Sequence, residues 1–432
     1  MEEVLEQVIR EATSPKFSAI AQAAKEANDV LESQAGLLRS PPHELRSVCL
    51  RALQLALESK QSKLISLAIS GFYKLLRDTE FHSGYEEDDE TTWLPSQLLG
   101  AIQSLPHHTH DTQVELLKAV LNMSCVSGIV VSGQIVRQVV GVCGLAYSRG
   151  GQQLRTSAQS AASQAIARLV TQLKEESQEQ EQLRSKDNQL QKTSQDNQDE
   201  EDLDYIAPPY DEMVPVINLI ADKLNDATKN QEDKKGPEVP ALFLLECAST
   251  LLSNLAGPIA SNTGSKKTKG TLLGKSTLYS KSSEQCNSAP AYCSTLLVAA
   301  LWQRLCPALV ALLGSPVSQR LAKTSSRSDG QMGRGSGCLA NPGPLFNNQQ
   351  ARAIYNVACW LVVLMGSVGE MRPVLESLLH RMLLYPPPQC RLDALKAVSE
   401  LLGNPTKLVQ LAGPILHTDP RNPHQNDLAL FR

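Results

Sequence analysis

The fold is decided by residues 45–78, which read LRSVCLRALQLALESKQSKLISLAISGFYKLLRD. Apolar residues recur there at steps of three and four, the spacing of one face of an α-helix. The first apolar stripe is Leu45, Val48, Cys49, Ala52, Leu53 and Ala56, and the second is Leu64, Ile65, Ala68, Phe72, Leu75 and Leu76. The five residues from Glu58 to Ser62 separate two helices. Helices this short are marginal in water, so both stripes must pack against each other and against further helices.

Polar residues mark where these helices begin. Ser40 is expected to cap the first helix, with Pro41 just inside its start, where a missing N–H costs nothing. Ser62 is expected to cap the second.

The same periodicity recurs along the chain. Further helices are predicted at residues 2–12, 16–38, 94–102, 111–125, 132–147, 155–173, 213–224, 239–255, 295–313, 350–366, 371–385 and 391–402. No stretch shows convincing strand alternation. The sequence therefore predicts an all-α fold, an array resembling armadillo or HEAT repeats that is interrupted by disordered linkers. No fixed repeat period is present, which leaves the repeat type open.

Composition changes along the chain divide it into segments. The divisions are a helical N-terminal domain at 1–173, an acidic polar linker at 174–204, a helical segment at 205–259, a basic Ser/Thr/Lys linker at 260–292, a helix at 293–313, a Ser/Gly-rich linker at 314–349, a helical block at 350–413 and a frayed tail at 414–432.

Overall composition excludes several classes of protein. The net charge of −4 gives no sign of nucleic-acid binding. The ten cysteines contain no C-x-x-C pair, which favours reduced, buried thiols; Cys49, Cys143, Cys247 and Cys359 lie within apolar helical faces. The opening residues MEEVLEQVIREA are acidic, unlike a signal peptide. Unbroken apolar runs such as 358–365 are far shorter than the roughly 18 residues that span a bilayer, so any membrane contact is expected to be peripheral.

Three motifs suggest ligand sites and are rejected. KGTLLGKS at 269–276 lacks the first glycine of a phosphate-binding loop, since residue 269 is lysine. GQMGRGSGC at 330–338 lacks dinucleotide-binding spacing and is interpreted as a flexible linker. His107, His108 and His110 have no accompanying cysteine or glutamate pattern, so we interpret them as a solvated loop that enters a helix capped by Asp111.

Two segments are candidate contact sites. The first is a basic stretch of five lysines: Lys266, Lys267, Lys269, Lys275 and Lys281. It would contact anionic lipid or serve as a phosphorylatable spacer, and the spacer is the preferred interpretation. Tyr385, Pro386, Pro387 and Pro388 form a short proline segment, either a partner-docking site or a rigid corner between helices. The corner is preferred. No nucleophile–base–acid arrangement can be assembled, so no enzymatic activity and no cofactor are expected.

Several stretches carry a resemblance to a known family. They are QLALESKQSKLISLAISGFYKLL at 54–76, QVELLKAVLNMS at 113–124, the helices at 135–147 and 158–173, LCPALVALLG at 305–314, RGSGC at 334–338, and the run from Arg381 to Gly403 containing LLYPPPQ. In this order they resemble the N-terminal dimerisation and cyclophilin-binding region of large Arf guanine nucleotide exchange factors, and within them the brefeldin A-inhibited exchange proteins.

The resemblance implies a specific role. In that family the N-terminal helical domain does not exchange nucleotide; it mediates self-association, contacts downstream domains and helps target the exchanger to Golgi and secretory-vesicle membranes. An Arf-family GTPase would be a partner only through the exchange domain, which is absent from these 432 residues. The Asn-Tyr-Asp-Cys run of the adjoining homology box is also absent, so a fragment or an incomplete product is expected. A cytoplasmic protein, peripheral on membranes, is implied; the alternative is a general cytosolic helical scaffold without a role in Arf signalling.

Overall fold

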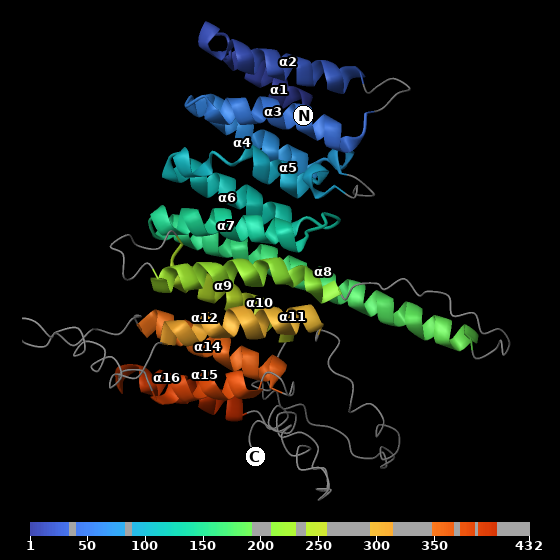
Figure 1. Cartoon of the computed structure of the whole chain (residues 1–432). Coiled ribbons are helices and arrows are strands. Elements are labelled where there is room, and N and C mark those ends of the chain that lie inside the picture. Colours follow the sequence, from blue (N-terminus) through green and yellow to red (C-terminus); the bar gives the residue numbers. More distant parts are fainter. Residues whose placement is uncertain are drawn as a thin grey trace, which may run out of the picture. The chain divides into compact units, whose positions relative to one another are not determined.

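The computed structural model describes residues 1–33, 40–82, 89–191, 209–229, 239–256, 294–313, 348–366, 372–384 and 388–403. Every regular element among these residues is helical, which confirms the predicted all-α array (Figure 1). The chain forms two compact units. Unit 1 contains Met1–Leu173 and Pro215–Cys247, and unit 2 contains Lys174–Val214 and Ala248–Arg432.

Unit 1 begins with eleven elements that are continuous in sequence apart from two gaps in the described residues. They are α1 (Glu2–Glu11), η1 (Pro15–Phe17), α2 (Ser18–Ser33), α3 (Pro42–Glu58), α4 (Ser62–Arg77), η2 (Thr79–Phe81), η3 (Glu90–Thr92), α5 (Leu94–Ala101), η4 (Leu105–His107), α6 (His110–Cys125) and α7 (Gly133–Arg149). The unit is completed by most of α9 (Val214–Lys229) and by the first parts of α8 (Gln152–Gln191) and α10 (Ala241–Ala256).

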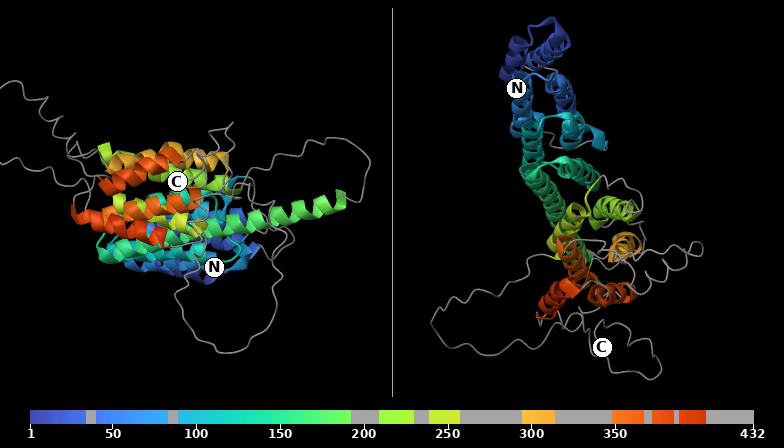
Figure 2. Two further views of the ribbon diagram at one scale, coloured as in Figure 1. Left: turned by 90° about the horizontal axis from the view of Figure 1, so that it is seen from below. Right: turned by 90° about the vertical axis from the view of Figure 1, so that its left-hand side faces the viewer.

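Successive helices of unit 1 pack on their neighbours. The helix α3 contacts α2, α4 and α5, while α4 also contacts α1 and α6. In Figure 1 and in the turned views of Figure 2, α1 to α7 follow one another as layers of roughly parallel or antiparallel rods. The two predicted stripes face this core: Leu53, Ala56, Leu64, Ala68, Phe72 and Leu75 are all completely buried. Each buried leucine of this kind contributes about 1.5–3 kcal/mol.

A glycine brings α3 and α4 together. A Cβ atom built on Gly71 would lie 2.5 Å from Leu53 Cδ2, inside van der Waals contact. The absence of a side chain at Gly71 therefore lets the Leu53 methyl groups reach the backbone of α4.

The predicted caps of three helices are wrong by one or two residues. The N-cap of α3 is Pro41 rather than Ser40, that of α4 is Gln61 rather than Ser62, and that of α6 is Thr109. Asp111 lies instead in the first turn of α6, where its charge still favours the positive end of the helix dipole. In none of these three helices does the cap side chain accept a hydrogen bond from a backbone N–H of the first turn, and helix ends vary by a residue or two when no such bond fixes them.

The helix α7 begins with a side-chain cap, in which Ser132 accepts a hydrogen bond from the backbone N–H of Ile135 at 3.2 Å. The helix α8 supplies small residues to unit 1. The alanine stripe of α8 is completely buried, and consists of Ala158, Ala161, Ala162 and Ala165. The helix α8 continues past residue 173, the predicted domain boundary, to Gln191.

Unit 2 is built from η5 (Pro209–Met213), α11 (Thr295–Ala300), the π-helical turn η6 (Leu301–Leu305), α12 (Cys306–Leu313), α14 (Asn348–Met365), α15 (Arg372–Leu384) and α16 (Pro388–Leu402), with the second parts of α8 and α10. The helices α14, α15 and α16 pack on one another, and α15 also contacts α12. Ser294 caps α11, accepting from Leu297 N–H at 3.0 Å, and donates to the carboxylate of Asp211.

One continuous helical run, Thr295–Leu313, is long and apolar enough to cross a membrane by length and composition. The sequence analysis predicted this helix, but it considered only unbroken apolar runs and therefore did not identify the helix as long and apolar enough to span a membrane. In the structure 56% of its most apolar window is buried within the fold, and a buried core helix meets the same criterion. The run packs against α15 and η5 as a core helix of unit 2.

Candidate interaction surfaces

Arg46 is the largest completely buried side chain in the described residues. Its guanidinium donates to Gln97 Oε1 at 2.8 Å, to the carbonyl oxygen of Phe81 at 2.6 Å and to that of Thr92 at 2.6 Å. Charged hydrogen bonds of this length are stronger than neutral ones. Arg46 therefore ties α3 to α5, η2 and η3.

This arginine bonds residues on both sides of segment 83–88. Phe81 and Thr92 flank residues 83–88, which lie outside the described residues. On the far side, Asp89 accepts from the backbone of Thr91 at 2.9 Å, and Glu90 accepts from the hydroxyl of Ser132 at 3.1 Å. The described residues on both sides of this segment are thus anchored to unit 1.

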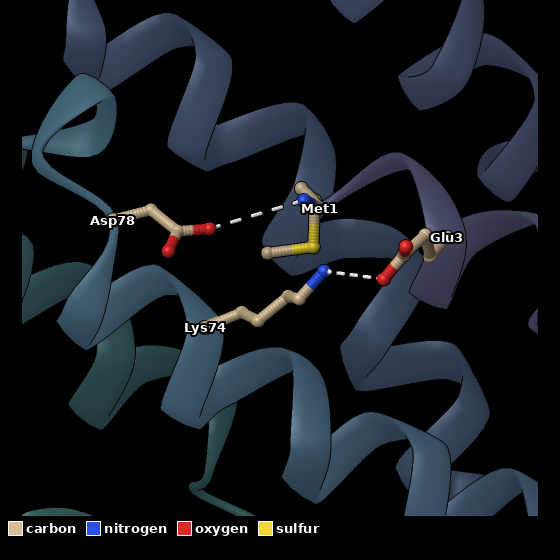
Figure 3. A network of polar contacts seen from close by, with 4 residues as sticks. All are labelled: Met1, Glu3, Lys74 and Asp78. Atoms are coloured by element: carbon tan, nitrogen blue, oxygen red, sulfur yellow. Dashed lines mark hydrogen bonds and ion pairs between the residues drawn. The ribbon is translucent and has the colours of Figure 1, made fainter.

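Charged side chains tie α1 to α4 at the surface (Figure 3). Lys74 Nζ lies 3.1 Å from Glu3 Oε2, and the amino group of Met1 lies 3.9 Å from Asp78 Oδ2. The hydrogen bond from Lys74 lowers the pKa of Glu3, and the same bond raises the pKa of Lys74. Glu3 is 84% exposed, so this pair contributes little to stability.

Unit 1 contains a mainly apolar surface depression, the α7–α9–α10 groove, which is a half-open cavity of about 150 Å³. Its floor consists of the buried residues Val140, Val239 and Leu244, and its rim of Gly141, Leu145, Leu219 and Lys223. A cavity of this volume accommodates one ring or one branched aliphatic side chain. The groove can therefore receive an apolar side chain from a binding partner.

Aromatic packing holds the helices around this groove. The rings of Tyr147 on α7 and Phe243 on α10 lie 5.2 Å apart at 44°, and the guanidinium of Arg155 lies 5.7 Å from the Tyr147 ring centroid. Burial raises the pKa of Tyr147, so the phenol stays neutral. Gly144 lets the side chain of Val239 approach the backbone of α7, since a Cβ at residue 144 would lie 2.7 Å from Val239 Cγ1.

The described residues contain no cluster of side chains that fits a metal site. No group of three or more His, Cys, Asp or Glu side chains in the described ranges could hold a metal ion. His108 instead pairs its Nε2 with the Ser104 hydroxyl at 3.0 Å, and burial lowers its pKa. The seven cysteines within those ranges are free thiols; Cys49, Cys143 and Cys247 are buried as predicted, whereas Cys359 is half-buried.

The contact sites predicted from sequence fall largely outside the described residues. Lys266, Lys267, Lys269, Lys275 and Lys281 lie there, as do Tyr385, Pro386 and Pro387. Pro388 is the first residue of α16. Both assignments therefore remain predictions.

Sequence analysis did not identify Arg46 or the α7–α9–α10 groove. Arg46 neighbours Leu45 and occupies a position three residues before Cys49, so its register places it beside the apolar stripe. This position was the sequence signal from which the burial of Arg46 could have been predicted. The groove joins residues about 100 positions apart, and helical periodicity contains no information on such pairings.

Comparisons with known proteins identify a matching domain family and two relatives of this chain. Residues 1–187, which include α1 to α7 and nearly all of α8, match the model of the DCB family, described as the Mon2/Sec7/BIG1-like dimerisation and cyclophilin-binding domain. The chain is 32% identical over 430 residues to brefeldin A-inhibited guanine nucleotide-exchange protein 3 of Homo sapiens, an alignment that covers 96% of this chain. The corresponding protein of Mus musculus is 32% identical over 438 residues, covering 98% of this chain.

The chain spans 18% of the length of these two relatives. The segments 54–76 and 113–124, which suggested the resemblance, both fall within the family match. The family resemblance recognised in the sequence is thus confirmed: residues 1–187 of this chain belong to the dimerisation and cyclophilin-binding (DCB) domain family of Mon2/Sec7/BIG1-like proteins.

Proposed function

We propose that this chain is a non-catalytic N-terminal regulatory and assembly region of an Arf-type guanine nucleotide exchange protein. It self-associates, contacts downstream domains and helps to target the exchanger to Golgi and secretory-vesicle membranes. The observation that carries this proposal is the match of residues 1–187 to a domain named for dimerisation and cyclophilin binding. Helical arrays support such a role because they offer extended surfaces that bind partners without a catalytic group.

The α7–α9–α10 groove is the proposed contact for self-association. It combines a buried apolar floor with a half-buried rim, and central apolar pockets of this type provide most of the binding energy at protein interfaces. A leucine or phenylalanine side chain of a second copy would fill it. Burial of one such side chain is worth about 1.5–3 kcal/mol.

Light scattering of the full chain over a concentration series tests this proposal. We expect a dimer that dissociates in Leu145→Asp, because a carboxylate on the rim is costly to bury against an apolar partner. The matched control is Leu121→Asp, a half-buried leucine of α6 that does not line the groove. Circular dichroism of both variants verifies folding.

Each result of that experiment has a defined meaning. Loss of the dimer in Leu145→Asp alone supports the groove, and a dimer that persists in both variants moves the interface elsewhere on the chain. A monomer at every concentration contradicts the assembly function and favours a general helical scaffold. Titration with a cyclophilin, followed by calorimetry, tests the second partner in the family description separately.

Membrane targeting has its own support. Leu296 is 59% exposed and Trp302 is 39% exposed on the apolar run Thr295–Leu313, although most of that run is buried. Exposed tryptophan and leucine side chains are typical of interfacial contact with lipid. We expect the chain to co-sediment with vesicles containing phosphatidylserine, and the double variant Leu296→Ser/Trp302→Ser to do so less. Equal sedimentation of wild type and variant would exclude this surface.

The absence of catalysis is also testable. We expect the chain to leave the rate of nucleotide release from an Arf-family GTPase unchanged. Acceleration of release would contradict the non-catalytic assignment.

A further inference from the structure

The helix α16 exposes a row of leucines to solvent. Leu392 is 59% exposed, Leu395 57% and Leu402 41%. Because an α-helix has about 3.6 residues per turn, these three side chains lie within an arc of about 80°, which we term the leucine face. The opposite side of α16 buries Cys390, Ala394 and Leu401.

Contacts with α14 hold the orientation of the leucine face. Asp393 accepts a hydrogen bond from the guanidinium of Arg352 at 2.9 Å, and the thiol of Cys359 donates to the carbonyl oxygen of Ala397 at 3.6 Å. Both bonds lie on the side of α16 that packs against its neighbours. The leucines are therefore presented to solvent by a helix that is already folded and positioned, which lowers the entropic cost of binding.

Basic side chains border the leucine face on both edges. Arg391 lies about 20° beyond Leu402 around the helix axis, and Lys396 lies about 40° beyond Leu392 on the other edge. Both basic side chains are exposed. The face thus combines an apolar centre with positively charged edges.

The surroundings of Arg391 extend this pattern. Its guanidinium donates to the carbonyl oxygen of Leu384 at 3.5 Å, which brings a fourth leucine, 56% exposed at the end of α15, beside the same edge. The exposed acid of α16 is Glu400, which lies about 40° beyond Lys396 and therefore further from the leucines. Charge at the edges of the face is thus mainly positive.

Exposed leucines with basic residues at their edges match the surface of an anionic bilayer. Leucine side chains enter the boundary between headgroups and acyl chains, while the long arginine and lysine side chains reach the lipid phosphates. Each basic residue near such a surface also gains from its negative potential. We therefore propose that the leucine face of α16 binds an anionic lipid surface. This rests on the membrane targeting proposed above, and adds a second contact surface and the class of lipid.

Sedimentation of the full chain with lipid vesicles tests the apolar part of this surface. We expect the chain to bind vesicles of phosphatidylcholine with phosphatidylserine more tightly than vesicles of phosphatidylcholine alone. Leu392→Ser/Leu395→Ser should weaken binding to the anionic vesicles at least about ten-fold, because two inserted side chains are lost. The control is Val130→Ser, which changes an apolar residue of unit 1 that is 37% exposed and should leave binding unchanged.

Charge variants test the electrostatic part. Arg391→Gln/Lys396→Gln should weaken binding to the anionic vesicles about ten-fold and leave binding to phosphatidylcholine alone unchanged. Glu400→Gln should strengthen binding to the anionic vesicles, an increase that a purely structural role of α16 would not produce. Arg51→Gln/Arg77→Gln makes the same change in net charge at exposed positions of unit 1 and serves as the control.

The outcomes separate this surface from the membrane targeting on which it rests. Equal binding of the wild type and Leu392→Ser/Leu395→Ser overturns the proposal, and targeting through α11 and η6 stands if Leu296→Ser/Trp302→Ser still weakens binding. Equal binding of the wild type to both kinds of vesicle excludes the anionic lipid, and binding to neither contradicts both proposals. A solution mass that falls in Leu392→Ser/Leu395→Ser without vesicles also overturns the proposal and assigns the leucine face to a second copy.

Discussion

Arg46 on α3 donates a hydrogen bond to Gln97 on α5, and Gln97 donates a hydrogen bond back to the backbone of α3. The Arg46 guanidinium donates to Gln97 Oε1 at 2.8 Å, and the Gln97 amide donates to the carbonyl oxygen of His43, also on α3, at 3.0 Å. With the bonds from Arg46 to Phe81 and Thr92, one buried side chain supports four segments of unit 1. A buried charge this extensively bonded is costly to disturb, because its acceptors lose their partners together.

Arg46→Met should therefore destabilise unit 1 strongly. Methionine fills similar space but leaves one buried and two partly buried acceptors without the guanidinium, at a cost of about 2–4 kcal/mol. Native-state hydrogen exchange of α3 and α5 measures this loss. Arg51→Met, an exposed arginine of the same helix, is the control and should change stability by less than about 0.5 kcal/mol. Equal effects of the two substitutions would contradict the role of Arg46.

The apolar stripes of α3 and α4 could be predicted from the sequence, whereas the hydrogen bonds of Arg46 could not. The stripes of α3 and α4 were predictable because helical periodicity depends on near neighbours, and most of their members are buried. Two members, Val48 and Ile65, remain half-buried, since the width of a buried face depends on the partner helices. The partners of Arg46 lie 35 to 51 residues away, and the groove residues lie further apart, so both depend on tertiary packing that periodicity does not specify.

Gly71→Ala should destabilise the contact between α3 and α4. The added Cβ would lie 2.5 Å from Leu53 Cδ2, and relief of such an overlap in a packed core costs about 1–3 kcal/mol. Gly141→Ala is the matched control, because no atom lies within 4 Å of a Cβ at that position in the middle of α7. Alanine there should stabilise the helix by up to about 1 kcal/mol. Chemical denaturation of both variants distinguishes packing from helix propensity; a stabilising Gly71→Ala would show that Leu53 repacks without strain.

The ion pair of Glu3 and Lys74 should make the free energy of unfolding depend on pH in the acidic range and in the basic range. The pKa of Glu3 is lower in the folded state. Its contribution to folding stability is therefore present above the unfolded pKa and is lost as pH falls through the folded pKa. The folded pKa of Lys74 is raised, so its contribution is present below the unfolded pKa and is lost as pH rises through the folded value.

Carbon-detected NMR titration of glutamate carboxyl groups measures this linkage. In Lys74→Met the pKa of Glu3 should return upward toward its ordinary value, and added salt should produce part of the same shift in the wild type. Lys118→Met, which removes the partner of Glu115 on α6, serves as the control and should leave Glu3 unchanged. A Glu3 pKa that is insensitive to Lys74→Met would contradict the ion pair of Figure 3.

The cysteines of unit 1 should differ sharply in their reactivity. Burial raises the pKa of Cys49 and of Cys143 to about 12, and a buried thiol of that pKa holds almost no thiolate near neutral pH. Cys125, at the end of α6, is exposed. Brief treatment of the folded chain with iodoacetamide should alkylate Cys125 and spare Cys49 and Cys143, as peptide mass spectrometry would show.

The same labelling reports on the integrity of the core, because the protection of Cys49 and Cys143 depends on packing as well as on pKa. In urea all three thiols should react at similar rates. In Arg46→Met, labelling of Cys49, which shares α3 with Arg46, should accelerate before that of Cys143 on α7. Simultaneous labelling of both would show that unit 1 opens as one cooperative body, and that the hydrogen bonds of Arg46 support the whole unit rather than its first helices.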